Sequence, residues 1–121
     1  MKMHLAKAPG QNAFTAYRDG FVSINQVEYA PPLLVTPTLL EVWGVSDFAA
    51  LESEHFKALL EHQPEIVLLG TGRQQRFPHP RLTADLLHAG IGVEAMNNEA
   101  ACRTFNILMN EDRRVLVVLL P

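Results

Sequence analysis

Two unbroken apolar runs constrain what this chain can fold into. Six consecutive apolar residues, Val115–Leu120, close the chain, and Ile66–Leu69 lies near its middle. Neither run alternates apolar and polar residues, which is the pattern of a strand covered on both faces. Together with Ile91–Met96 they predict three core strands separated by helix-length segments. Such spacing indicates right-handed parallel crossovers, and we expect the last run to be the central strand.

Helix signals fill the segments between these strands. Ser53 is placed to cap a helix that carries Phe56, Leu59 and Leu60 and ends at Pro64. Pro80 fits the start of a second helix, and Gly90 its left-handed end. Asn97 or Asn98 caps a third helix that runs to about Asn110. Residues 46–121 therefore read as an α-β-α-β-α-β core.

The second helix carries Leu82, Leu86 and Leu87. The third helix has a narrow polar arc, which is expected to face solvent. That arc holds Glu99, Arg103, Asn106 and Asn110.

The first third of the chain, residues 1–45, is rich in β formers and turn signals. Asp19-Gly20 predicts the turn of a hairpin between residues 14–17 and 21–24, and Asn25-Gln26 a turn into a further strand at 27–29. Prolines bracket another short strand at 33–36, because proline cannot donate to a ladder. Leu39–Trp43 is expected to form one more.

These elements predict an α/β fold in one domain, residues 1–121. The expected architecture is a three-layer sandwich around a mixed, largely parallel central sheet, with an extra β-rich layer from the N-terminal part. A length of 121 residues suits one domain, and 48% hydrophobic with 19% charged residues is ordinary for a globular protein.

Charge and cysteine content narrow the function classes. The net charge of −3 argues against nucleic acid as a partner. A single cysteine, Cys102, allows no internal disulfide and is compatible with a reducing compartment. No run is long enough to span a membrane, and the first ten residues lack signal-peptide or transit character. We therefore expect a soluble, cytoplasmic protein.

A glycine-rich loop follows the middle apolar run and raises the question of anion binding. Gly70, Thr71 and Gly72 stand at the carboxyl end of one predicted strand and Asn97 at the end of another, where open α/β sheets place ligands. Arg73, Arg76 and Arg103 could add positive charge beside the helix N-terminus. The loop nevertheless lacks the lysine of a P-loop and the third glycine of a dinucleotide fingerprint. In the other interpretation, Gly70-Thr71-Gly72 only forms a tight exit from the strand, which lets strand and loop pack closely.

Candidate catalytic groups do not converge in the sequence. Cys102 lies in the first turns of a helix beside Arg103, which could lower its pKa, but no histidine is paired with it locally. We interpret it as a packing residue, or as a conceivable nucleophile of the crevice formed by the Gly70–Arg76 and Met96–Arg103 loops. His55 and His62 are too far apart on one helix to share a metal ion. The sequence predicts no metal site, no cofactor and no catalytic residue.

The succession of motifs resembles a known family. It comprises the Asp-Gly hairpin, the Leu33–Pro37 strand, the Ile66–Gly72 run, the Gly90–Met96 strand, the Ala100–Leu108 helix and the closing apolar strand. This set resembles the bacterial and archaeal domain-of-unknown-function family four-nine-eight, which includes the mitochondrial respiratory complex I assembly factor three. The resemblance implies the sandwich fold described above. Because no presequence is recognised, the chain is similar to the bacterial members.

Two functional hypotheses follow. In the first, the chain is a non-catalytic binding or assembly protein whose partner is another protein, by resemblance linked to respiratory complex I or membrane-complex assembly. Its partner surface would include Leu39, Val42 and Trp43, although Trp43 could instead pack under the first helix. In the second, it binds a small anion or metabolite, or is an enzyme of unknown activity, at the glycine crevice. The sequence does not fix the oligomeric state.

Overall fold

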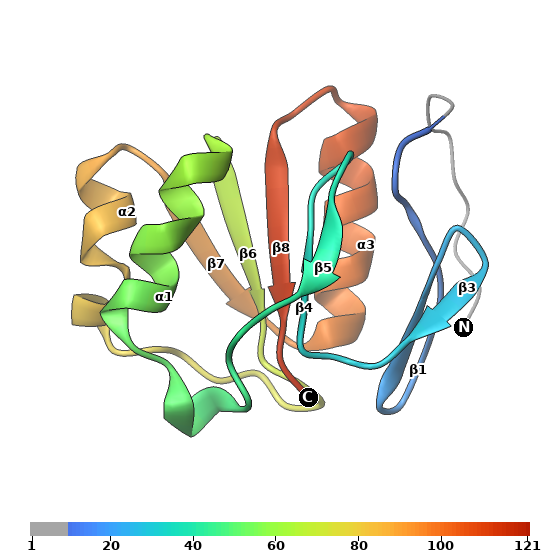
Figure 1. The fold of residues 1–121 in the computed structure, drawn as a ribbon, viewed down its shortest axis with the longest axis horizontal. Coiled ribbons are helices and arrows are strands. Elements are labelled where there is room, and N and C mark those ends of the chain that lie inside the picture. Colours follow the sequence, from blue (N-terminus) through green and yellow to red (C-terminus); the bar gives the residue numbers. More distant parts are fainter. Residues whose placement is uncertain (1–9) are drawn as a thin grey trace.

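A computed structural model describes residues 10–121 and shows helices packed on both faces of a sheet (Figure 1). The strands are β1 (Phe14–Arg18), β2 (Phe21–Ile24), β3 (Val27–Tyr29), β4 (Leu33–Val35), β5 (Leu40–Val42), β6 (Ile66–Gly70), β7 (Gly92–Met96) and β8 (Val115–Leu119). The α-helices are α1 (Ser53–Lys57), α2 (Ala84–His88) and α3 (Asn98–Asn110). Short 3₁₀ segments cover Phe48–Ala50, Ala58–His62 and Pro80–Thr83.

The central sheet has five strands in the order β5-β4-β8-β6-β7. Strand β6 runs parallel to both β7 and β8, with Leu68 opposite Glu94 on one side and Val117 on the other. Strands β4 and β5 add an antiparallel edge. The sheet is therefore mixed, and the predicted central place of the closing apolar run is confirmed, since all five residues of β8 are buried.

Four layers are stacked in Figure 1: α1 and α2, the central sheet, α3, and the small antiparallel sheet β1-β2-β3. One apolar core fills the space on the α3 side and includes Phe14, Phe105 and Val117. A second core on the α1 and α2 side includes Phe56, Leu86 and Leu116. The predicted three-layer sandwich with an extra β layer is thus confirmed.

The turns of the small sheet follow the sequence signals. Gly20 has a φ of 83° in the β1–β2 turn. Asn25 and Gln26, at φ 49° and 71°, close the β2–β3 turn in the left-handed region that such two-residue hairpin loops require. The predicted hairpin and the predicted second turn are both confirmed.

Several local predictions were wrong. The N-cap of α1 is Glu52, whose side chain forms a capping box with His55, and Ser53 is the first helical residue. On α2, Leu86 is buried whereas Leu87 is 70% exposed, because successive residues of a helix point about 100° apart. Strand β7 lies at the sheet edge, and its exposure alternates, so it is less completely covered than a core strand.

The polar arc of α3 is not wholly solvated. Asn106 is only 5% exposed because the small sheet packs on this side of the helix. Its side-chain oxygen accepts a hydrogen bond from the Phe14 backbone N–H at 2.9 Å, and its amide nitrogen donates to the Phe14 carbonyl at 2.8 Å. Asn106 therefore pairs with β1 as a neighbouring strand would, and the small sheet is held to α3 by this pair.

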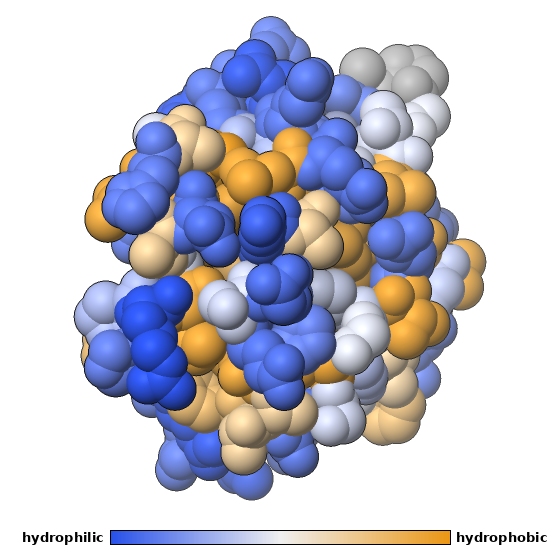
Figure 2. Space-filling view, turned by 60° about the vertical axis from the view of Figure 1, so that its left-hand side comes forward, coloured by the Kyte–Doolittle hydropathy of each residue, from blue (hydrophilic) through white to orange (hydrophobic). Residues whose placement is uncertain are grey.

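The outer surface is mixed in polarity. Figure 2 shows the side on which α1 and α2 lie, where apolar residues form small groups among hydrophilic side chains. None of the helices in the described part of the chain is long and apolar enough to cross a membrane.

Candidate functional site

The two loops of the predicted crevice do meet at one edge of the sheet. The Thr71 N–H donates to the Met96 carbonyl at 2.8 Å, and the Asn98 N–H donates to the Gly72 carbonyl at the same distance. This follows from the parallel pairing of β6 and β7, which brings their carboxyl ends together. The expectation that the loops share an edge is therefore confirmed.

Several polar groups at this edge already have hydrogen-bond partners within the protein. The Gly72 N–H donates to Asn98 Oδ1 at 3.0 Å. At the N-terminus of α3, Asn97 accepts from the Ala100 N–H at 2.9 Å. The Thr71 hydroxyl donates to the Gln74 carbonyl at 2.6 Å. An anion that used these groups would have to displace their partners. Anion binding here stays a prediction from the sequence.

The glycines of the loop meet a packing requirement. A Cβ on Gly70 would collide with Asn98 Oδ1 and the Leu119 side chain. At Gly72, where φ is +85°, a Cβ would lie 2.6 Å from the Pro121 carbonyl oxygen. Close packing of the strand end explains why residue 70 is glycine, and close packing together with a positive φ explains Gly72.

The arginines expected at the crevice do not converge. Arg73 forms a 3.5 Å ion pair with Asp19 in the β1–β2 turn, on the α3 side of the sheet. Arg76 lies over the ring of Phe48, which packs on the other side. Arg103 pairs along α3 with Glu99 at 3.4 Å.

Cys102 is fully buried in the core between α3 and the central sheet. Burial, and to a lesser degree the nearby Glu99 carboxylate, raises the pKa of its thiol. Because the thiolate is the nucleophilic form, this environment works against the reactivity considered for Cys102 and fits its interpretation as a packing residue.

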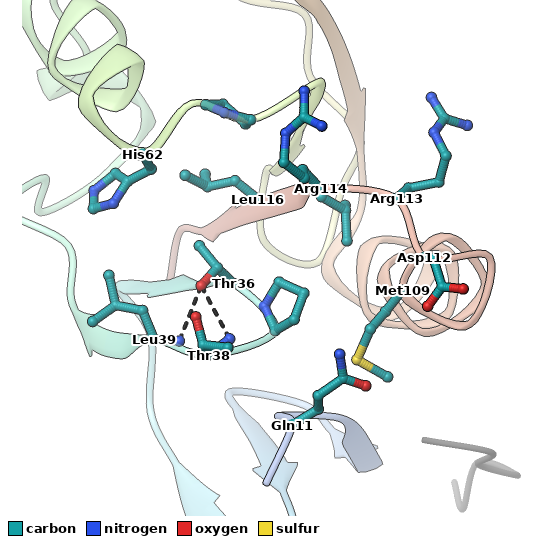
Figure 3. Close-up of a pocket in the computed structure, with 13 residues that line it drawn as sticks. Gln11, Thr36, Thr38, Leu39, His62, Met109, Asp112, Arg113, Arg114 and Leu116 are labelled. Carbon is teal, nitrogen blue, oxygen red and sulfur yellow. Dashed lines mark hydrogen bonds between the residues drawn. The ribbon is translucent and has the colours of Figure 1, made fainter. Parts of the chain in front are cut away.

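A pocket of about 490 Å³ lies at the opposite end of the sheet, where β6 and β8 begin. Figure 3 shows its walls, which come from the β4–β5 turn, the end of the second 3₁₀ segment, the end of α3 and the start of β8. The apolar part of its lining consists of Pro37, Leu39, Pro64, Met109, Val115 and Leu116.

Several polar groups at the rim of this pocket interact with adjacent residues. Glu65 accepts from the Arg114 N–H at 2.7 Å and pairs with Arg113 at 3.4 Å. These contacts hold the pKa of the Glu65 carboxyl below its usual range, the Arg114 N–H being the larger cause. The Thr36 hydroxyl accepts from the Leu39 N–H at 2.9 Å. In Figure 3 the Arg113 and Arg114 side chains extend away from Leu39. The pocket thus combines an apolar floor with a polar rim, where Arg113 is paired with the adjacent Glu65.

The three residues predicted for a partner surface have different environments. Leu39 is half-buried and lines the pocket. Val42, at the other end of the edge strand β5, is 76% exposed. Trp43 is buried, with its ring 6.1 Å from that of Phe56 in α1, so it packs under the first helix and is not an exposed anchor.

The pocket was not found from the sequence because its walls are far apart along the chain. The sequence signal for it was weak. It consists of Met109 near the end of an amphipathic helix and two adjacent arginines, Arg113-Arg114, before the last strand. Among residues 10–121, no group of three or more His, Cys, Asp or Glu side chains is placed to hold a metal ion.

The fold and the pocket together define a small α/β protein with a mixed sheet, an outer β layer on α3 and an apolar recess at the sheet edge. Residues 14–120 match the family model described as a protein of unknown function, DUF498/DUF598. The chain belongs to this family, as the sequence resemblance predicted.

Two curated relatives show the range of the family. A protein of Francisella tularensis subsp. holarctica named 13 kDa major membrane protein is 33% identical over 109 residues, which are 88% of this chain and 89% of that protein. The zebrafish (Danio rerio) NADH dehydrogenase [ubiquinone] 1 alpha subcomplex assembly factor 3 is 33% identical over 104 residues, which are 84% of this chain. The match spans only 59% of that assembly factor.

A solved structure has the same fold. The crystal structure of a Bordetella parapertussis protein matches with a TM-score of 0.88 and 40% sequence identity, covering 94% of this chain and 98% of that one.

Proposed function

We propose that this chain is a protein-binding module that assists the assembly of a multisubunit complex, acting by contact and not by catalysis. The observation that carries the proposal is the environment of β5. Its Val42 is 76% exposed at the sheet edge, and the residue before the strand, Leu39, lines an apolar-floored pocket of about 490 Å³. Exposed apolar side chains and apolar recesses are both typical of protein interaction sites, and here they lie at the two ends of one edge strand.

The relatives support the kind of partner. Proteins named as assembly factors of NADH dehydrogenase align with 84% of this chain. We infer a role related to the assembly of respiratory complex I or another membrane complex. A cytoplasmic location remains a prediction, and the family also includes a protein named as a membrane protein.

A capture experiment with a matched pair of variants tests the proposal. The tagged chain is incubated with lysate of its source cells, and the enriched proteins are identified by mass spectrometry. Val42→Lys places a charge on the edge of the central sheet, and Val27→Lys does the same on the small sheet, where Val27 is 54% exposed. We expect the wild type and Val27→Lys to enrich the same protein, and Val42→Lys to lose it.

Two outcomes would contradict this function. One is that repeated captures with the wild type enrich no protein. The other is that Val42→Lys enriches the same protein as Val27→Lys, which would place the contact elsewhere on the molecule.

A further inference from the structure

The opposite edge of the central sheet has a second groove, independent of the pocket beside β5. It lies between the edge strand β7 and the segment that follows the glycine loop. Phe77, 74% exposed, and Pro78 form one wall, and Val93, Glu94 and Ala95 form the other.

The hydrogen bonds of β7 fix which backbone groups face this groove. The Met96 carbonyl points to β6, where it accepts from Thr71. The backbone N–H and carbonyl groups of successive residues point to alternate sides of a strand. Those of Glu94 therefore also point to β6, whereas those of Val93 and Ala95 point to the outer edge. The Ile91 N–H, which shares their direction, donates to the Leu86 carbonyl of α2 at 2.9 Å. Helix α2 thus covers the start of the outer edge and leaves Val93 and Ala95 uncovered by it.

A side-chain amide occupies part of this edge. Gln75 Nε2 donates to the Ala95 carbonyl at 3.0 Å. This is the bond that a neighbouring strand would make with its backbone N–H. Gln75 is exposed, so an incoming strand can replace it at little cost.

Charge decides what kind of strand fits. Val93 and Ala95 pack toward the α1 and α2 side, and Glu94 therefore projects from the other face. In a pair of identical chains, the register that joins Val93 of each copy to Ala95 of the other places Glu94 opposite Glu94. Like charges directly opposite are unfavourable, whereas a basic residue there is favourable.

We propose that the outer edge of β7 binds an extended segment of a partner protein in which a lysine or arginine lies between two apolar residues. The segment adds a strand to the sheet through Val93 and Ala95. Its apolar side chains contact Phe77 and Pro78, and its basic side chain lies beside Glu94.

Two blocked peptides, Thr-Val-Lys-Val-Thr and Thr-Val-Glu-Val-Thr, test this proposal by ¹⁵N NMR titration. We expect the lysine peptide to shift the amide signals of Val93 and Ala95 and to bind about fivefold tighter than the glutamate peptide. Glu94→Lys should reverse this preference. Glu41→Lys, the matched change in the centre of the other edge strand β5, should leave it unchanged.

Several results would overturn the proposal. They are no shift at Val93 and Ala95 with either peptide, shifts at Leu40 and Val42 instead, or a preference that Glu94→Lys does not alter. Shifts at Val93 and Ala95 that depend on protein concentration without peptide would assign the edge to a second copy of the chain. Capture through Val42 is measured separately, so failure of this inference is distinguishable from failure of the proposed function.

Discussion

At the scale of single residues, Asn98 fixes the edge where the glycine loop lies. It is 5% exposed, its Oδ1 accepts from the Gly72 N–H, and its Nδ2 donates to the Leu120 carbonyl at 2.7 Å. One side chain thus ties the exit of β6, the start of α3 and the end of β8. A position that looks from the sequence like part of a ligand site has a structural function in the fold.

Replacing Asn98 tests this interpretation. Asn98→Ala leaves a buried N–H and a buried carbonyl without partners, and each should cost about 1–3 kcal/mol of unfolding free energy. Urea unfolding measures the loss. Asn110→Ala, at an exposed position of the same helix, serves as the control and should change stability by less than about 0.5 kcal/mol. Equal stability of the two variants would show that Asn98 does not hold the edge together.

At the scale of elements, the small sheet depends on α3 for its place. Besides the Asn106 pair, the rings of Phe14 and Phe105 meet edge to face with centroids 5.2 Å apart. Polar and apolar contacts therefore join β1 to the side of α3 that faces away from the central sheet. Helix α3 is consequently buried on two sides.

Asn106→Ala should loosen the small sheet selectively. With the Asn106 side chain gone, the Phe14 N–H loses its acceptor. This N–H and its neighbours in β1 and β2 should then exchange with solvent deuterium faster, because local opening becomes less costly. Amide exchange of β6 and β8 should change little. A uniform increase over all strands would mean that the small sheet does not open as a separate unit.

At the scale of the whole molecule, the sequence predicted the sheet better than the sites. Apolar runs such as Val115–Leu120 reveal a strand buried on both faces, and helix-length spacing reveals parallel crossovers. The burial of Asn106 was not predicted, because a polar arc indicates solvent exposure only when the helix packs against the protein on one side. Helix α3 packs against two sheets. The pocket beside Leu39 could not be predicted, since its walls meet only in the folded chain.

The central claim is that the molecule acts through the β5 edge and its pocket, and not through the glycine crevice. Hydrogen–deuterium exchange of the chain with and without its captured partner protein tests this most directly. We expect the partner to slow exchange over residues 36–42 and 109–116, and to leave residues 70–76 and 96–103 unchanged. Protection confined to residues 70–76 and 96–103 would contradict the account.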